Sequence, residues 1–142
     1  MEGIILVSEL KLEQIIDAAQ QIAVATLTED GTAPDVRIVL GVYDKLGKQV
    51  LFMSSRQAEK VAEIAAHGRA AFATPQFDDQ GVVRVRHAHV AKITPTTAQS
   101  ALYQQKYPQT AKFAAHSDFF ALTFDEADVT INGETTTVKI TD

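Results

Sequence analysis

The sequence predicts a mainly β (α+β) protein in which six or more antiparallel strands form a closed or nearly closed β-barrel with short peripheral helices. Short runs rich in β-branched residues are separated by turn signals along most of the chain. Helical periodicity is confined to a few short segments between these runs. Because closure removes exposed strand edges, a barrel is the expected arrangement for so many short strands.

The length and the composition fit one soluble domain. The chain has 142 residues, of which 46% are hydrophobic and 22% are charged, as in ordinary globular proteins. We therefore expect a single domain over residues 1–142, without an internal linker. The apolar opening, residues 3–7, is too short for a secretory or membrane-spanning segment, and we expect a cytoplasmic protein.

The residue types that are missing exclude several classes of site. The sequence has no cysteine, which excludes disulfides, thiolate nucleophiles and cysteine-held zinc or iron–sulfur sites. Any redox chemistry must therefore come from a bound cofactor. The net charge of −5 has the wrong sign for a protein that neutralises nucleic-acid phosphates, so we expect no nucleic-acid partner and no membrane partner.

The first half of the chain is predicted to hold two helices and three strands. Apolar residues three or four apart follow Ser8, which is placed to cap a helix that ends near Gln21. A second helical pattern begins at Ala58 and ends at Gly68, where a left-handed cap is easily made. The strands between these helices, bounded by turn residues, are Ile22–Thr28, Val36–Tyr43 and Gln49–Met53.

The second half is predicted to be strands around one broken helix. Pro95 opens a helical region that is interrupted at Tyr107-Pro108 and continues to about Ala115, since proline fits only at a break or at a helix start. The strands are Arg69–Phe77 and Val82–Ile93, joined by the turn Asp78–Gly81, and then Phe119–Phe124 and Val129–Ile140, the latter with a turn at Asn132-Gly133.

One group of residues is suited to bind a phosphate. Counting outward from a turn centred near Leu46 puts Arg37 opposite residues 54–56. Arg37 would then lie beside Ser54, Ser55 and the start of the helix that carries Lys60, and these donors together suit a phosphate. The alternative is that Ser55 only caps its helix, that Arg37 points to solvent and that Lys60 belongs to a solvated helix face.

These segments, in this order, resemble the pyridoxamine 5′-phosphate oxidase-like FMN-binding split barrels, a family that includes small general-stress-type flavoproteins. The resemblance covers most of the chain, and it implies the split-barrel fold and FMN as the cofactor. The matching pieces are Ile22–Leu27 with Asp30-Gly31 and Pro34, Val36–Leu40, Leu51–Ser55 with Lys60-Val61, Val83–Val85 and the Tyr107-Pro108 break.

The resemblance implies which residues would bind FMN. The family's phosphate-binding arginine, hydroxyl and lysine fall on Arg37, Ser54 and Lys60, and Ser55 would assist them. The remaining implied residues would line the flavin ring, three of them through the backbone that follows the arginine; they are Ile38, Val39, Leu40 and Met53. Since cofactor contacts in the family also come from a second subunit, a homodimer is expected. No catalytic side chain is expected, because the flavin ring carries the electrons.

The sequence also departs from the oxidase itself. Val82 stands where the oxidase has a flavin-contacting glutamine, and His87 replaces the usual glycine. The oxidase ends in a segment with tryptophan and arginine that shapes its pyridoxal pocket, whereas this chain has no tryptophan and stops at Asp142. We therefore expect an FMN-dependent oxidoreductase of unknown substrate that is not an authentic pyridoxamine phosphate oxidase. The alternatives are a non-catalytic flavin-binding protein for storage, sensing or delivery, and a split barrel that uses deazaflavin or haem.

One predicted strand carries two histidines and two arginines. His87 and His89 are two residues apart and would share one face, so they could ligate a metal ion together with a third residue. A closed metal site needs three or four converging ligands, and we therefore expect ordinary half-buried or interface histidines and no metal. Arg84 and Arg86 are expected on the opposite face, as an exposed charged edge rather than a second anion site.

Overall fold

The computed structural model describes residues 2–76 and 81–140 of the chain. The described elements are the helices α1 (Glu2–Ala18), α2 (Glu59–Ala66) and α3 (Thr97–Lys106), the 3-10 helix η1 (Pro108–His116), and the strands β1 (Gln21–Leu27), β2 (Pro34–Asp44), β3 (Gln49–Ser55), β4 (Arg69–Ala73), β5 (Val82–Ile93), β6 (Ser117–Phe124), β7 (Glu126–Ile131) and β8 (Glu134–Lys139).

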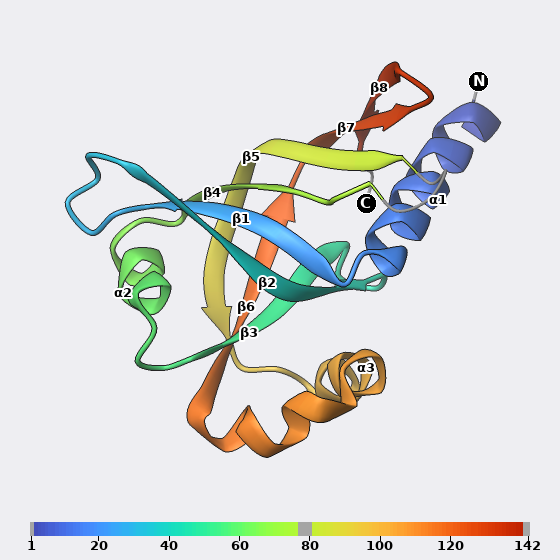
Figure 1. The fold of residues 1–142 in the computed structure, drawn as a ribbon. Helices are drawn as coiled ribbons and strands as arrows, with labels where there is room; N and C mark the ends of the chain where they lie inside the picture. Colours follow the sequence, from blue (N-terminus) through green and yellow to red (C-terminus); the bar gives the residue numbers. More distant parts are fainter. Residues whose placement is uncertain (1, 77–80, 141–142) are drawn as a thin grey trace.

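The strands form a closed antiparallel barrel with a two-stranded extension (Figure 1). The order in the sheet is β4-β1-β2-β3-β6-β5-β7-β8, and β4 also pairs with β5. This last pairing closes β1 to β6 into the barrel, while β7 and β8 continue the sheet from β5. The predicted mainly β barrel with short helices is confirmed, and the split-barrel fold with it.

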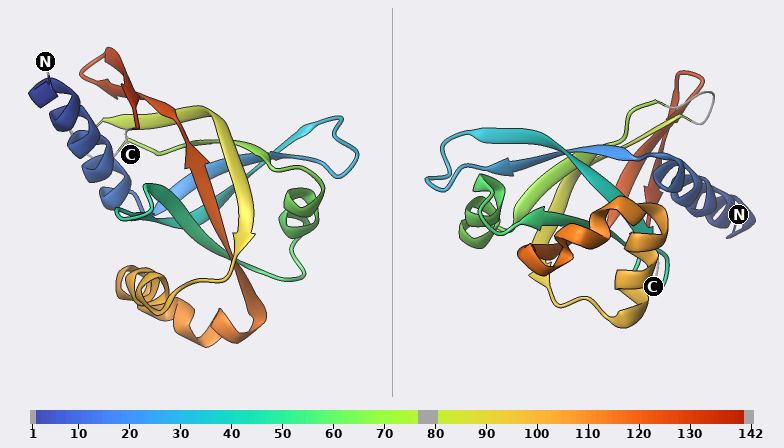
Figure 2. Two further views of the ribbon diagram at one scale, coloured as in Figure 1. Left: turned by 180° about the vertical axis from the view of Figure 1, so that it is seen from behind. Right: turned by 60° about the horizontal axis from the view of Figure 1, so that its bottom comes forward.

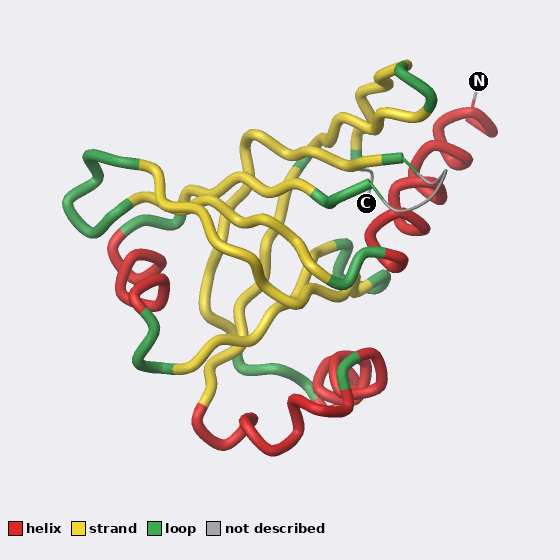
Figure 3. The backbone as a smooth tube through the Cα atoms, in the orientation of Figure 1, coloured by secondary structure: helices red, strands yellow, loops and turns green. Residues whose placement is uncertain are grey.

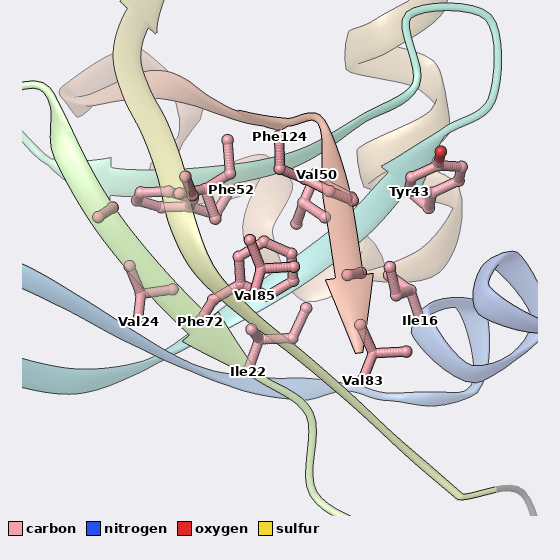
Figure 4. Packing of buried hydrophobic residues seen from close by; sticks show 14 of the residues in the cluster. Ile16, Ile22, Val24, Tyr43, Val50, Phe52, Phe72, Val83, Val85 and Phe124 are labelled. Carbon is pink, nitrogen blue, oxygen red and sulfur yellow. The ribbon is translucent and has the colours of Figure 1, made fainter. Parts of the chain in front are cut away.

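The inside of the barrel is the main hydrophobic core. Alternate residues of β1, such as Ile22 and Val24, point inward and are buried, as a strand with one core face requires. Aromatic rings fill the centre, where Phe52 stacks on Phe120 with ring centroids 5.3 Å apart. Figure 4 shows how side chains from strands on several sides of the barrel meet there.

A second core lies outside the barrel wall, under α3. Val42, Leu51 and Ala121 of β2, β3 and β6 pack there against Tyr103 and Tyr107. These strands are therefore covered on both faces, which explains their nearly continuous runs of buried residues. In Figure 3, α3 and η1 lie together on this side of the strands.

The other two helices lie at opposite ends of the barrel (Figures 1 and 2). Leu12, Ile15 and Ile16 of α1 and Ile64 of α2 are buried in the main core. Each helix thus shields one open end of the barrel from water. Within the described residues, no helix combines the length and the apolar character that crossing a membrane requires.

Three predicted features of the helix ends were wrong. The first helix begins at Glu2 and ends at Ala18, so Ser8 lies inside it and is not its N-cap, and Gln21 already begins β1. A capping residue marks a helix start only where the residues before it are not helical. Here the residues before Ser8 are helical from Glu2 onward. Gly68 makes no left-handed cap. The C-cap of α2 is His67 with an extended φ of −139°, because the chain passes almost directly into β4.

A β-bulge in β5 overturns the predicted separation of its arginines and histidines. Phe72 pairs with Val85 and Ala70 pairs with Ala88, so that two residues of β5 oppose the single residue between them in β4. The residues after Val85 therefore fall out of simple alternation, and Arg84, Arg86, His87 and His89 are all exposed on the outer face. The predicted turn at residues 78–81 lies mostly outside the described residues.

Candidate functional site

A groove opens where β2 and β3 separate. Their pairing runs from Asp44↔Gln49 to Gly41↔Phe52 and ends there, while β2 continues beside β1 as far as Pro34. The two strands enclose, together with α2, α3 and η1, a groove of about 410 Å³. A split of this kind exposes backbone and side chains of both strands to a ligand.

The groove brings together seven of the eight predicted cofactor-binding residues. Its lining from β2, β3 and α2 is Ile38, Val39, Leu40, Met53, Ser54, Ser55 and Lys60. The remaining lining was missed by sequence reasoning and consists of Tyr103, Gln109, Thr110, Phe113, His116 and Ser117. These residues lie more than forty positions further along the chain, and the helix break at Tyr107-Pro108 was the only sequence signal near them.

Lys60, Ser54 and Ser55 are the polar side chains that β3 and α2 contribute. The N-cap of α2 is Ala58, without a side-chain hydrogen bond, so Ser55 does not cap the helix and instead accepts from the Gln57 amide at 3.4 Å. Burial lowers the pKa of Lys60, and the charge of Arg37 lowers it further. In the described part of the chain Lys60 has no ion pair, so it is a partly desolvated cation without a counterion.

Arg37 lies next to the groove but does not line it. Its guanidinium pairs with Asp35, two residues earlier in β2, and with Oε2 of Glu63 on α2 at 3.5 Å. Its Nε is buried and has no hydrogen-bond partner. The predicted alternative, that Arg37 points to solvent, does not describe it either, since the side chain is only 25% exposed. The guanidinium is held against two carboxyl groups, within electrostatic reach of Lys60.

Glu63 is the buried end of this charge cluster. The Thr26 hydroxyl donates to its Oε1 at 2.6 Å. Burial raises the pKa of Glu63, and the neighbouring Asp35 carboxyl raises it further, whereas the Thr26 hydrogen bond and the charge of Arg37 act in the opposite direction. Through these contacts, the cluster links β1, β2 and α2. Nothing in the sequence pattern indicated Glu63 or Thr26.

Several apolar side chains also line the groove. Met53 and Leu40 are half-buried, while Ile38 and Phe113 are 58% and 53% exposed. The Tyr103 hydroxyl donates to the Leu40 carbonyl at 2.9 Å, and burial raises the pKa of Tyr103 to about 12. This hydrogen bond from α3 fixes the β2 backbone along the groove. A fixed backbone suits a flat ring that lies against β2.

The sequence matches one family model over most of its length. The model is described as Pyridoxamine 5′-phosphate oxidase, and it matches residues 9–131. No curated protein sequence matches the chain at a significant level.

Solved structures with the same fold have very different sequences. The General Stress Protein 26 from Bacillus anthracis str. Sterne aligns with a TM-score of 0.73 at 12% identity, over 94% of this chain and 98% of that one. A heme binding protein from Mycobacterium smegmatis aligns with a TM-score of 0.73 at 18% identity, over 91% of this chain. An F420 reductase aligns with a TM-score of 0.61 at 20% identity, over 78% of this chain and 90% of that one.

The lengths of these proteins differ as well. The chain spans 57% of the heme binding protein and about 60% of two further similar structures. At identities of 20% and below, the similarity concerns the fold.

Proposed function

The chain belongs to the pyridoxamine 5′-phosphate oxidase family, and from this premise we propose that it binds FMN in the groove between β2 and β3. The observation that carries the proposal is Lys60, a partly desolvated cation that lines the groove without a carboxylate partner in the described chain. A phosphate beside Lys60 would supply the missing negative charge. We further propose that the protein is an FMN-dependent oxidoreductase.

The residues of the groove fit the two parts of FMN. Lys60, Ser54 and Ser55 offer an ammonium and two hydroxyls for a phosphate. The half-buried Met53 and Leu40 offer apolar contact for a ring. Arg37 would join the phosphate site by exchanging its carboxyl partners for phosphate oxygens, since its charge already acts on Lys60.

The protein's own contribution to the chemistry is position and environment. When bound, the flavin ring accepts and donates the electrons, and no side chain need act as a base. Tyr103 fixes the Leu40 backbone from the α3 side, so the ring would rest on a rigid strand. Lys60 and the two serines would hold the phosphate end and thereby orient the ring.

We also propose that the working form is a homodimer. Val36 and Ile38 on β2 are 65% and 58% exposed, and Phe113 beside the groove is 53% exposed. A second subunit over this apolar rim would shield both the rim and a bound ring from water. The cytoplasmic location stays a prediction, and so does the absence of pyridoxamine phosphate oxidation.

Other cofactors are the second candidate, because proteins described as a heme binding protein and an F420 reductase share the fold. Deazaflavin or haem would replace FMN in that case, and a flavin-binding protein without turnover is the remaining alternative. The absorption spectrum of the purified protein separates flavin from haem. Stimulated electron transfer with a reductant and an acceptor separates an enzyme from a binding protein.

The decisive experiment is a titration of the protein with FMN and with riboflavin, which has the same ring and no phosphate. We expect Lys60→Gln to weaken FMN about tenfold or more, as the loss of a charged hydrogen bond does, and to leave riboflavin affinity nearly unchanged. Lys139→Gln is the matched control, because Lys139 is exposed on β8 and outside the groove. Equal FMN affinity in both variants would contradict the proposed phosphate site.

A further inference from the structure

A larger concavity lies on the outer wall of the barrel and shares no residue with the groove. It measures about 980 Å³ and runs over β1, β4, β5 and β6 to the turn between β2 and β3. Its lining comes from strands and loops alone. Small, half-buried side chains, among them Ala25 and Ala71, line part of it, so that a flat molecule could lie close to the wall.

The strand registers align donor side chains in this concavity. Arg69 of β4 pairs directly with His89 of β5, and His89 pairs with Thr123 of β6. Directly opposed residues have their Cβ atoms about 5 Å apart, and all three side chains are exposed. The β5 bulge adds Arg86 and His87 to the same face, where regular alternation would have turned one of them inward.

Basic residues outnumber acidic residues in this lining. Arg69, Arg86 and Lys48 are basic, two histidines accompany them, and Asp125 is the one acidic residue of the lining. The chain as a whole carries a net charge of −5, so a basic concavity is not the result of composition.

Arg69 differs from every other arginine of the chain. Each of the others pairs with a carboxylate: Arg37 with Asp35 and Glu63, Arg56 with Asp118, and Arg84 and Arg86 with Asp128. Among the residues that the structure describes, Arg69 has no ion pair and no side-chain hydrogen bond. Its five N–H donors are available to a ligand, and a guanidinium suits phosphate oxygens in pairs.

We propose that this outer-wall concavity is a second ligand site, which binds a nucleotide-sized phosphate ester. Arg69 holds the phosphate, and Arg86, His87 and His89 surround it. Ala25 of β1 and Ala71 of β4, which are paired in register and half-buried, form the surface on which the ring lies. The volume is that of sites for molecules of this size. A metal ion is disfavoured by the two arginines, and in the described chain no three metal-ligating side chains come together.

The proposal is tested by calorimetric titration of the purified full chain with ADP, and with adenosine as the uncharged control. We expect ADP to bind and adenosine to bind far more weakly, because the phosphates meet Arg69. Arg69→Ala and the milder Arg69→Gln should each weaken ADP about tenfold or more. Unchanged melting temperatures show that the two variants are folded.

Two further variants distinguish this site from its surroundings. Arg84→Ala is the matched control. Arg84 is exposed on β5 and pairs with Asp128, as Arg86 does, yet it does not line the concavity. Lys60→Gln removes the cation of the FMN groove. Both should leave ADP affinity unchanged, whether or not the groove binds FMN.

Three results would overturn the proposal. One is the absence of ADP binding to the wild-type chain. Another is an ADP affinity that folded Arg69 variants share with the wild type. The third is a loss of ADP binding in Lys60→Gln with none in the Arg69 variants, which would assign ADP to the groove.

Discussion

At the scale of single residues, the charge cluster around Arg37 is the feature with the largest consequences. Arg37 is partly buried between Asp35 and Glu63, and its Nε lacks a partner. A guanidinium in such a place is held in one position by its carboxyl partners. Binding of a phosphate by Arg37 therefore requires an exchange of partners, and the two carboxyl groups set how readily that exchange occurs.

We predict that Arg37→Ala weakens FMN and spares riboflavin. The loss of an ordered, charged hydrogen bond costs about 1.5–3 kcal/mol, which is roughly ten- to 150-fold in dissociation constant. Fluorescence titration with both ligands measures the two affinities. Equal losses would place Arg37 at the ring or in the fold, and an unchanged FMN affinity would mean that Arg37 keeps its carboxyl partners in the complex.

A second prediction concerns the pH dependence of stability through Glu63. Its pKa is raised above the ordinary 4.5, first by burial and then by Asp35. A carboxyl group with a raised pKa contributes stability that is complete below pH 4.5 and is lost as the pH rises through the raised value. The free energy of unfolding of the wild type, relative to Glu63→Gln, should therefore fall as the pH rises above about 4.5.

Denaturant unfolding of both proteins across this pH range measures the difference. Asp35, Arg37 and Thr26 face Glu63 in the wild type, and all three are retained in the variant. If the free energy of unfolding of the wild type, relative to Glu63→Gln, instead rises with pH, Arg37 stabilises the Glu63 carboxylate more than burial destabilises it.

At the scale of elements, α3 fastens the end of α1 to the barrel. The Lys106 ammonium donates to the carbonyls of Ile16 at 3.3 Å, Ala19 at 2.7 Å and Gly41 at 3.0 Å. Ile16 lies in the last turn of α1 and Ala19 directly follows the helix, where the negative end of the helix dipole favours a cation. The Tyr107 hydroxyl adds a bond to the Gly41 carbonyl at 2.6 Å, and burial raises its pKa.

We predict that Lys106→Met destabilises the fold by about 2 kcal/mol. Methionine keeps the apolar stem of the side chain, but it leaves the carbonyls of Ile16 and Ala19 without this charged donor, and charged hydrogen bonds contribute about 1.5–3 kcal/mol. Thermal or denaturant unfolding measures the change. Lys112→Met on η1 is the control, because Lys112 is exposed, and a similar loss in both variants would contradict the role of the Lys106 contacts.

At the scale of the whole molecule, the covering of the barrel is uneven. Helices α1 and α2 shield its ends, and α3 with η1 covers the outer face of β2, β3 and β6. The outer face of β2 next to the groove carries the exposed side chains of Val36 and Ile38. Apolar side chains gathered on an exposed face are typical of an interaction surface.

We predict that the FMN-loaded protein is a dimer and that Val36→Asp separates it. Sedimentation should give about twice 15.4 kDa for the wild type, and a mass near that of one chain for the variant, because a carboxylate would be buried at the interface. Leu46→Asp is the control, since Leu46 is 96% exposed on the turn between β2 and β3. A wild-type mass of one chain with FMN fully bound would exclude the dimer.

The sequence by itself determined most of the strands, the break at Tyr107-Pro108 between α3 and η1, and the residues of one wall of the groove. Alternation and turn residues located β1, β2, β3 and β5, because these signals depend on neighbours along the chain. Ser54 and Ser55 end β3, and Lys60 follows them closely at the start of α2. Their meeting in the groove required only a turn and a helix start.

The tertiary structure alone decided the contacts between distant segments. Arg37 was expected beside Ser54, but Glu63 competes for its guanidinium because α2 packs against β1. The face of His87 depended on a bulge, which arises from the register between β4 and β5 and has no signal in β5 alone. Tyr103 reaches Leu40 only because closing the barrel brings α3 under β2, and such closure depends on all the strands at once.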